Sequence, residues 1–285
     1  MIPTTLVTAT ELARLQARGN VLVADCRFDL ADAGKGERDW AQSHIPGAIH
    51  FHLDRDLSDL SKRALGRHPL PHDLVFSAAL ARAGWRPGFD IVAYDDAQGA
   101  LAAARLWWLL RLAGVRNAAV LDGGWAAWRE AGLPLESGTV APAESTVQLS
   151  LDRAQVVWFD ELERRRASGD VLLLDARAAA RYRGEIEPID AVAGHVPGAR
   201  NRPFADNLQE GGRFKPRERL REEFESLLGG RPARDIVHMC GSGVTACHNL
   251  LAMEHAGLAG SRVFAPSWSG WISDPSRPVA TGSPP

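Results

Sequence analysis

Short apolar runs of strand length alternate with amphipathic helical segments along this chain. In the second half, residues 171–175, 235–239 and 262–264 are apolar runs that predict buried strands. Residues 217–228 carry leucine and phenylalanine at a helical period, and residues 245–256 predict a further helix. Short apolar strands that alternate with helices predict an α/β fold, in which helices cover both faces of a parallel sheet.

The pattern occurs twice. Residues 21–27 resemble residues 171–177, and the His-Ile-Pro-Gly-Ala segment at 44–48 resembles His-Val-Pro-Gly-Ala at 195–199. Residues 91–95 parallel 236–240, and the Trp-x-x-Trp segment at 125–128 parallels that at 268–271. An interval near 150 residues is far above the roughly 20–50 residues of stacked repeats, so the chain is a duplicated domain. We predict a first domain over 1–138, a linker over 139–150 and a second domain over 151–285.

Composition excludes several classes of function. The chain has 285 residues, of which 45% are hydrophobic and 24% charged, with a net charge of -2. This balance gives no electrostatic footprint for nucleic acid or for an anionic membrane, and no apolar run approaches the ~18–20 residues of a membrane span. The amino terminus lacks the pattern of a secretory signal, and three scattered cysteines do not form a disulfide framework. We therefore expect a cytoplasmic protein.

The two halves differ most at the end of one strand. There the first half has Asp95, whereas the second has Cys240 followed by Gly-Ser-Gly. Ligands of open α/β sheets bind beyond the carboxyl ends of the strands, where a glycine-bearing loop can point its N–H groups inward and favour a thiolate. We predict that Cys240 is a nucleophile, although a small buried residue at a tight turn is the alternative. Cys26 and Cys247 are predicted to be core residues.

The residues of this loop do not fit the other functions that such a loop can have. A Cys-x5-Arg phosphatase needs an arginine where the chain has Ala246, and the G-x-G-x-x-A match to a dinucleotide site is weak on its own. The chain has no G-x-S-x-G element for a serine hydrolase and no C-x2-C or H-E-x-x-H spacing for a metal. We expect neither a metal nor a cofactor.

The paired charges at two strand ends, one in each half, are predicted to be structural. Asp25 with Arg27, and their counterparts Asp175 with Arg177, stand at strand ends, where carboxylates usually accept loop N–H groups. No run of glycines surrounds Asp95, so the first domain is predicted to be catalytically silent.

The tandem halves, the two His-x-Pro-Gly-Ala segments, the loop from Cys240 to Cys247 and the Trp-x-x-Trp element at 268–271 resemble the two-domain rhodanese-type sulfurtransferases. The Cys-Gly-Ser-Gly-Val-Thr loop is most similar to the mercaptopyruvate branch of that family. The thiosulfate branch typically carries Arg-Lys after the cysteine. The resemblance implies two tandem rhodanese-like domains, each a parallel sheet flanked by helices.

The resemblance also implies a mechanism. Cys240 attacks a small-molecule sulfur donor, mercaptopyruvate or else thiosulfate, and passes the sulfur from a persulfide to cyanide, a small thiol or thioredoxin. A relay of Ser242, His68 and Asp54 protonates the pyruvate enolate in the mercaptopyruvate branch, and Arg181 holds the substrate carboxylate. The loop residues Gly241, Gly243, Val244 and Thr245 bind the thiolate and the equally anionic persulfide.

One departure from the family pattern concerns donor binding. The branch often has a second substrate arginine after Glu-Pro, but here Ile189 follows Glu187 and Pro188. Arg183 or another basic residue substitutes for it, or one arginine holds the carboxylate alone. The alternative to an enzyme is a persulfide carrier or binding module that a partner protein loads.

Overall fold

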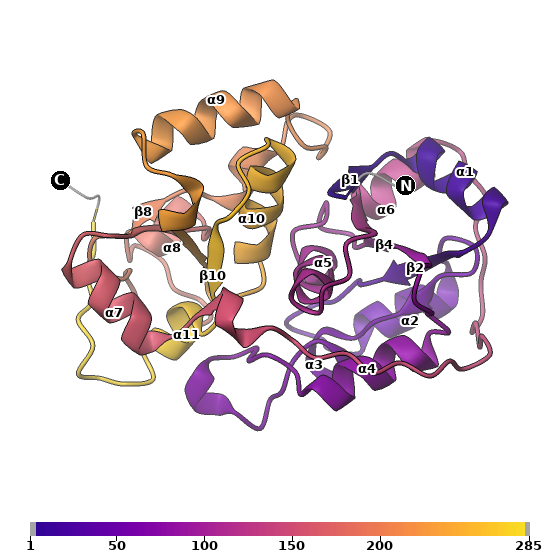
Figure 1. Ribbon diagram of the computed structural model, residues 1–285, viewed down its shortest axis with the longest axis horizontal. Helices are drawn as coiled ribbons and strands as arrows, with labels where there is room; N and C mark the ends of the chain where they lie inside the picture. The colour runs from indigo at the N-terminus through magenta and orange to yellow at the C-terminus, as the bar shows by residue number, and fades with distance from the viewer. Residues whose placement is uncertain (1–3, 283–285) are drawn as a thin grey trace. The chain divides into compact units, whose positions relative to one another are not determined.

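Each half of the chain builds one five-stranded parallel sheet, which confirms the predicted fold class. The computed structural model describes residues 4–282 (Figure 1). The strand order is β1-β5-β4-β2-β3 in the first sheet and β6-β10-β9-β7-β8 in the second, and all pairs are parallel. Because corresponding strands occupy corresponding places, the duplication read from the sequence is also a duplication of topology.

The first helix of the first half has a capped N-terminus. Thr8 and Glu11 form a reciprocal capping box that satisfies N–H groups at the start of α1. The elements are β1 (Leu6–Val7), α1 (Ala9–Arg18), β2 (Val21–Asp25), α2 (Lys35–Gln42), β3 (Ile49–His50), α3 (Leu53–Asp56), the 3-10 helix η1 (Arg63–Leu65), α4 (Asp73–Arg82), β4 (Asp90–Tyr94), α5 (Ala102–Leu112), β5 (Ala118–Leu121) and α6 (Gly124–Glu130).

The second half places its five strands in the same order. Its elements are η2 (Arg153–Gln155), β6 (Val156–Val157), α7 (Phe159–Ala167), β7 (Leu172–Asp175), α8 (Ala179–Tyr182), β8 (Arg200–Asn201), η3 (Phe204–Asn207), α9 (Arg217–Leu228), η4 (Ala233–Asp235), β9 (Ile236–Met239), α10 (Ala246–His255), β10 (Arg262–Phe264) and α11 (Ser267–Trp271). The predicted strands and helices of this half are confirmed to within one residue at each end, because every one of them is a buried apolar run or stripe.

Each sheet packs its own core. In the first half Trp128 packs with Val23, Val92 and other strand residues, and in the second Trp271 packs with Leu173 and Val237 in the same way. Both indoles donate to a carbonyl just beyond their helix, Trp128 to Pro134 and Trp271 to Pro278. Burying a tryptophan therefore leaves no N–H without a partner at either position.

The compact units do not coincide with the halves of the sequence. The first unit contains residues up to Asp59, Leu70–Asp152 and Gly211–Arg213, and the second contains Leu60–Pro69, Arg153–Glu210 and the chain from Phe214. The predicted linker over 139–150 lies within the first unit, and the boundary drawn from the sequence stays a proposal. Segment Leu60–Pro69, although early in the sequence, belongs to the unit built around the second sheet.

Hydrogen bonds to α11 hold this early segment in place. The Arg67 N–H donates to Ser269 Oγ (3.0 Å), and Ser273 Oγ donates to the carbonyl of Ala64 (3.2 Å). Gly66, at φ +103°, lies so close to the start of α11 that an added Cβ would stand 2.5 Å from the carbonyl oxygen of Pro266. Only glycine fits this approach.

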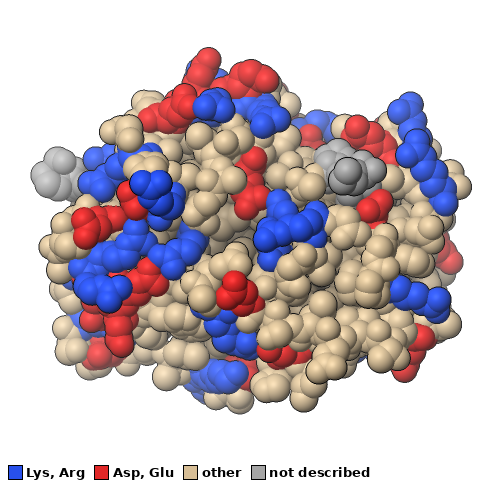
Figure 2. Space-filling view, in the orientation of Figure 1, with Lys and Arg blue, Asp and Glu red and all other residues tan. Residues whose placement is uncertain are grey.

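On the face drawn in Figure 2, basic and acidic side chains lie beside one another. None of the helices within residues 4–282 is long and apolar enough to cross a bilayer.

Gly66→Ala tests the close approach of the early segment. Gly198, also in the second unit, has φ +83° but open space around its Cβ position, so Gly198→Ala isolates the cost of backbone strain. We expect Gly198→Ala to lower the free energy of unfolding by about 1 kcal/mol and Gly66→Ala to lower it by at least about 1 kcal/mol more. Denaturant titration measures both, and equal losses would contradict the contact with Pro266.

Candidate active site

Cys240 follows the last residue of β9 and begins the loop that leads into α10. The N–H of Gly243 donates to Cys240 Sγ (3.1 Å), and the Cys240 side chain is buried. Gly243 takes φ +77°, and a Cβ there would lie 2.4 Å from the carbonyl oxygen of Ala265. Glycine at this position therefore lets the loop close on the sulfur, as a thiolate or persulfide requires.

Ser267 fixes the other side of the cysteine. It is a buried residue with φ +53°, a left-handed conformation that costs a non-glycine residue about 1–3 kcal/mol. Its hydroxyl accepts from the Cys240 N–H (3.1 Å) and donates to the carbonyl of Phe264 (3.0 Å). At the corresponding place the first half has Gly124 with φ +55°. Our sequence analysis gave Ser267 no role, although its alignment with a glycine in the repeat is a signal.

Ser242 and His68 lie together. Ser242 Oγ and His68 Nδ1 are 2.8 Å apart, and both side chains are buried. His68 reaches this position because it lies on segment Leu60–Pro69, which belongs to the second unit. Asp54, the third member of the predicted relay, lies half-buried in α3 of the first unit, and its part in the relay stays a proposal.

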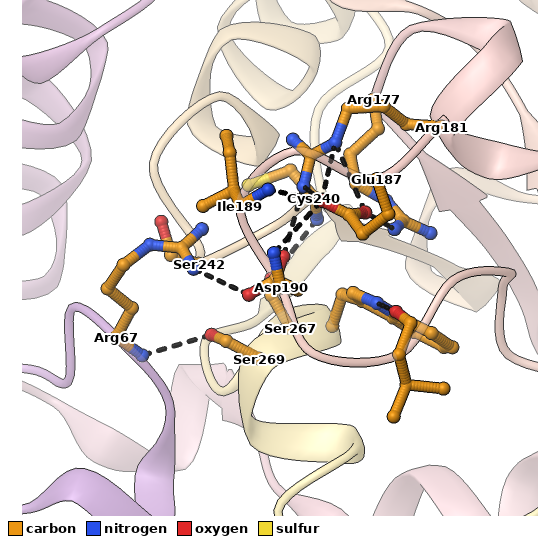
Figure 3. Close-up of polar contacts among 12 residues, drawn as sticks. Arg67, Arg177, Arg181, Glu187, Ile189, Asp190, Cys240, Ser242, Ser267 and Ser269 are labelled. Carbon is orange, nitrogen blue, oxygen red and sulfur yellow. Dashed lines mark hydrogen bonds and ion pairs between the residues drawn. The ribbon is translucent and has the colours of Figure 1, made fainter. Parts of the chain in front are cut away.

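Arg181 projects from α8 toward the loop (Figure 3). Its Nε and Nη2 donate to Glu187, and Nη2 also donates to Asp190 (3.0 Å). A Cβ on Gly241 would lie 3.7 Å from both Nη atoms of Arg181. The guanidinium is therefore next to the residue that follows the cysteine, where a carboxylate of the donor would need it.

A second arginine, which the sequence analysis did not single out, lies at the same place. Nη2 of Arg67 is 3.1 Å from the Cβ position of Gly241, and its Nη1 donates to Asp190 (2.5 Å). Arg183, which the sequence offered as a substitute for a second substrate arginine, pairs instead with Glu185 (2.6 Å). The motif that contains His68 already held Arg67, but nothing in the sequence shows that the two residues approach Gly241.

Acidic and basic side chains alternate along one line beside the cysteine. Successive ion pairs join six residues at 2.6, 3.5, 2.7, 3.0 and 2.5 Å: Asp175, Arg177, Glu187, Arg181, Asp190 and Arg67. We call these residues the ion-pair ladder. Burial alone would raise the pKa of Glu187, but hydrogen bonds from Arg181 and from the N–H groups of Asp190 and Ile189 outweigh it and hold that pKa below its usual value.

The corresponding loop of the first half closes on a carboxylate. Asp95 Oδ1 accepts from the N–H groups of Ala97 and Gly99, and Oδ2 accepts from those of Leu101 and Ala103, at 2.7–3.1 Å. This loop contains few glycines, but it curls nevertheless, because Gln98 and Gly99 both take positive φ. The anion that this loop encloses is therefore the carboxylate of its own residue, Asp95.

The remaining sequence predictions concern residues with a structural role. Asp25 accepts from the N–H and side chain of Arg27, and Asp175 accepts from Arg177 in the same way, as predicted for strand-end carboxylates. Cys26 and Cys247 are fully buried core residues, and Cys247 Sγ donates to the carbonyl of Gly243 (3.3 Å). These features hold the loops and strands in place.

The comparison with protein families matches this geometry. The model of the rhodanese-like domain matches residues 8–131 and again residues 159–274, one copy over each sheet. The chain belongs to the rhodanese family.

Full-length relatives place it among two-domain members. A Pseudomonas aeruginosa protein named "Probable 3-mercaptopyruvate sulfurtransferase" is 47% identical over 97% of this chain and 98% of its own length. The thiosulfate sulfurtransferase of Gallus gallus is 30% identical over 94% of this chain and 93% of its own. The solved structure of 3-mercaptopyruvate sulfurtransferase from Leishmania major superposes with a TM-score of 0.81 at 30% identity, covering 93% of this chain and 73% of that one.

The buried carboxylate of the first half predicts a pH dependence. Burial raises the pKa of Asp95 from 3.8 to about 6, and the N–H groups of Ala103, Gly99 and Ala97 oppose the shift only in part. Between about pH 4 and pH 6 the folded loop therefore holds a proton that the unfolded chain has released. The contribution of this proton to stability is present below pH 4 and is lost as the pH rises through 6.

Hydrogen exchange at Ala97, Gly99, Leu101 and Ala103 measures this effect. We compare the protection of these four amides, corrected for intrinsic exchange, in the wild-type protein and in Asp95→Asn. Between pH 4 and pH 7 the protection in the wild-type protein should fall relative to the variant by an amount corresponding to about 1–3 kcal/mol. Parallel profiles for the two proteins would contradict the raised pKa.

Proposed function

We propose that this protein transfers a sulfane sulfur from 3-mercaptopyruvate to a thiophilic acceptor through a persulfide on Cys240. Membership of the rhodanese family and full-length similarity to named sulfurtransferases make it a sulfurtransferase. The observation that carries the proposal is a thiol enclosed by a loop N–H, with a hydroxyl–imidazole pair and an arginine at the same loop.

In the first step the Cys240 thiolate attacks the sulfur of the donor. The new S–S bond forms as the C–S bond of mercaptopyruvate breaks, and the bonding pair goes to carbon to give the enolate of pyruvate. Gly243 N–H stabilises the thiolate before attack, and the loop residues Gly241, Val244 and Thr245 line the rest of the anion site. Arg181 holds the donor carboxylate with its fork of N–H groups.

The leaving enolate needs a proton. Ser242 Oγ delivers it to carbon and recovers a proton from His68, with which it shares a 2.8 Å hydrogen bond. Asp54 completes the relay by stabilising the charged imidazole. Pyruvate then leaves, and Cys240 carries the outer sulfur as a persulfide.

In the second step an acceptor thiolate attacks the outer sulfur. The S–S bond of the persulfide breaks and the Cys240 thiolate returns. A thiol acceptor leaves as its own persulfide, and cyanide, which attacks in the same way, leaves as thiocyanate. Small thiols, cyanide and the exposed thiol of thioredoxin are acceptors of suitable chemistry. Three free buried cysteines suit the reducing cytoplasm, where we propose that the protein works.

We expect mercaptopyruvate to be a better donor than thiosulfate. Gly241 and Ser242 offer no side-chain cation from the loop itself, and the leaving enolate has a proton source in Ser242. Thiosulfate is the second candidate, and a relative of this chain carries that name. The relatives do not favour the alternative of a carrier that a partner loads, and steady-state release of pyruvate separates the two. The first domain is silent in this scheme because Asp95 occupies the nucleophile's place.

Cys240→Ser should fold but take up no sulfur. With mercaptopyruvate and no acceptor, the intact mass of the wild-type protein should rise by one sulfur atom, and that of the variant should not change. Cys247→Ala is the matched control and should load normally, because that thiol is buried against Gly243. Sulfur found on Cys247 or Cys26 would refute the assignment.

The relay predicts a difference between donors. Ser242→Ala and His68→Gln should each lower kcat for mercaptopyruvate by about 10²–10⁴-fold, the usual contribution of a positioned acid or base. Both should change kcat for thiosulfate far less, because sulfite leaves as a stable anion that needs no proton. Equal losses with the two donors would show that the pair acts through loop structure rather than proton transfer.

A further inference from the structure

Two arginines from distant parts of the sequence converge on Gly241. Arg67 comes from segment Leu60–Pro69 and Arg181 from α8, and both guanidiniums lie within 4 Å of the Cβ position of Gly241 (Figure 3). A longer side chain at this position would collide with them. Glycine after the cysteine thus makes room for cations that other segments supply.

Arg67 has hydrogen-bonding capacity left for a ligand. Its Nη1 donates to Asp190, but its Nε is buried and has no hydrogen-bond partner within residues 4–282. A buried donor without a partner costs about 1–3 kcal/mol, so a bound acceptor would relieve that cost. Ile189, by contrast, is half-exposed and offers no charge.

Asp190 holds the two arginines together. One carboxylate oxygen accepts from Arg67 (2.5 Å) and the other from Arg181 (3.0 Å), and the side chain is only 4% exposed. The backbone N–H of Asp190 donates to Glu187 (3.0 Å), which also binds Arg181. The carboxylate is therefore fixed between the guanidiniums.

We propose that Arg67 is the second donor-binding cation of this site and that Asp190, by bridging Arg67 and Arg181, makes the site selective for a monoanionic donor over a dianionic one. The inference rests on the proposed function, because it assigns these residues to the donor of the Cys240 reaction.

Charge is the physical reason for the selectivity. Glu187 and Asp190 both bind Arg181, and Asp190 also binds Arg67, so these carboxylates offset the charge that the two arginines present. Mercaptopyruvate brings one negative charge, which the N–H groups left open on the two arginines can bind. Thiosulfate brings two, and its second charge meets the buried carboxylate of Asp190 at close range. Asp190 therefore acts as a positioning residue whose charge also disfavours one class of donor.

The first arm of the test removes the cation. Arg67→Met keeps the aliphatic stem, and we expect kcat/KM for mercaptopyruvate to fall about tenfold to a hundredfold, mainly through KM, as for the loss of a charge-assisted contact. Arg63→Met, an exposed arginine on the same segment, is the matched control and should change neither donor. In the Arg67→Met background, Ile189→Arg should recover part of the loss. Unchanged KM in Arg67→Met would overturn the role of Arg67.

The second arm removes the bridging charge. Asp190→Asn should raise the ratio of kcat/KM for thiosulfate to that for mercaptopyruvate by several-fold to about tenfold, and added salt should shrink this gain. Asp190→Glu, which restores the charge, should return the ratio toward wild type, and Glu185→Gln, an exposed acid of the same loop, should leave it unchanged. A ratio that does not move in Asp190→Asn would overturn the selectivity. If that variant does not fold, Asp190→Ser gives the same comparison.

Different results would overturn the proposed function and the role of Arg67 and Asp190. If wild-type protein forms no persulfide with mercaptopyruvate, the proposed function fails. If it does so while Arg67→Met and Asp190→Asn keep wild-type donor ratios and KM values, only the further inference fails.

Discussion

The loop at the carboxyl end of each central strand closes around an acceptor atom, and the function of each half follows from which atom that is. Curling the loop turns backbone N–H groups inward, where they need partners because they are buried. In the first half the four donors are satisfied by the Asp95 carboxylate. In the second half Gly243 donates to the Cys240 sulfur, which can also react. One fold thus holds a fixed anion in one copy and a nucleophile in the other.

The ion-pair ladder explains how three arginines are held in place next to this loop. Guanidiniums withdrawn from water are costly unless each has a carboxylate partner with good geometry. Along the ladder every arginine has at least one such partner, from the buried Asp175–Arg177 pair to Asp190 and Arg67 at the outer end. In the first half the buried pair that corresponds to Asp175 with Arg177 is Asp25 with Arg27. The residues that extend the ladder in the second half are those that we propose to bind the donor.

Apolar periodicity and the internal repeat were enough to predict a parallel sheet in each half, three strands and two helices of the second half, and the place of Cys240 at a strand end. The sequence could not predict contacts that depend on the path of the backbone. In the sequence nothing distinguishes Arg67 and Asp190 from other charged residues. Their positions depend on the packing of Leu60–Pro69 on α11 and on the turn at Glu187. The contact of the Ser267 hydroxyl with the Cys240 N–H likewise depends on the left-handed backbone at that residue. Nor does the sequence show that the loop after Asp95 curls, because it is the Asp95 carboxylate that accepts the N–H groups there.

The position of segment Leu60–Pro69 has a consequence for how the protein is made. His68 is separated by 174 residues from Ser242, and Arg67 by 123 from Asp190, so a ribosome releases both long before their partners exist. The segment must wait as an exposed loop while the first sheet folds, and closing it onto the second unit carries the entropy cost of a long chain loop. A fragment that begins at Arg153 would contain Cys240 but not this segment. The second half alone would therefore lack Arg67 and His68, and these residues reach Cys240 only after the chain has been made as far as α11.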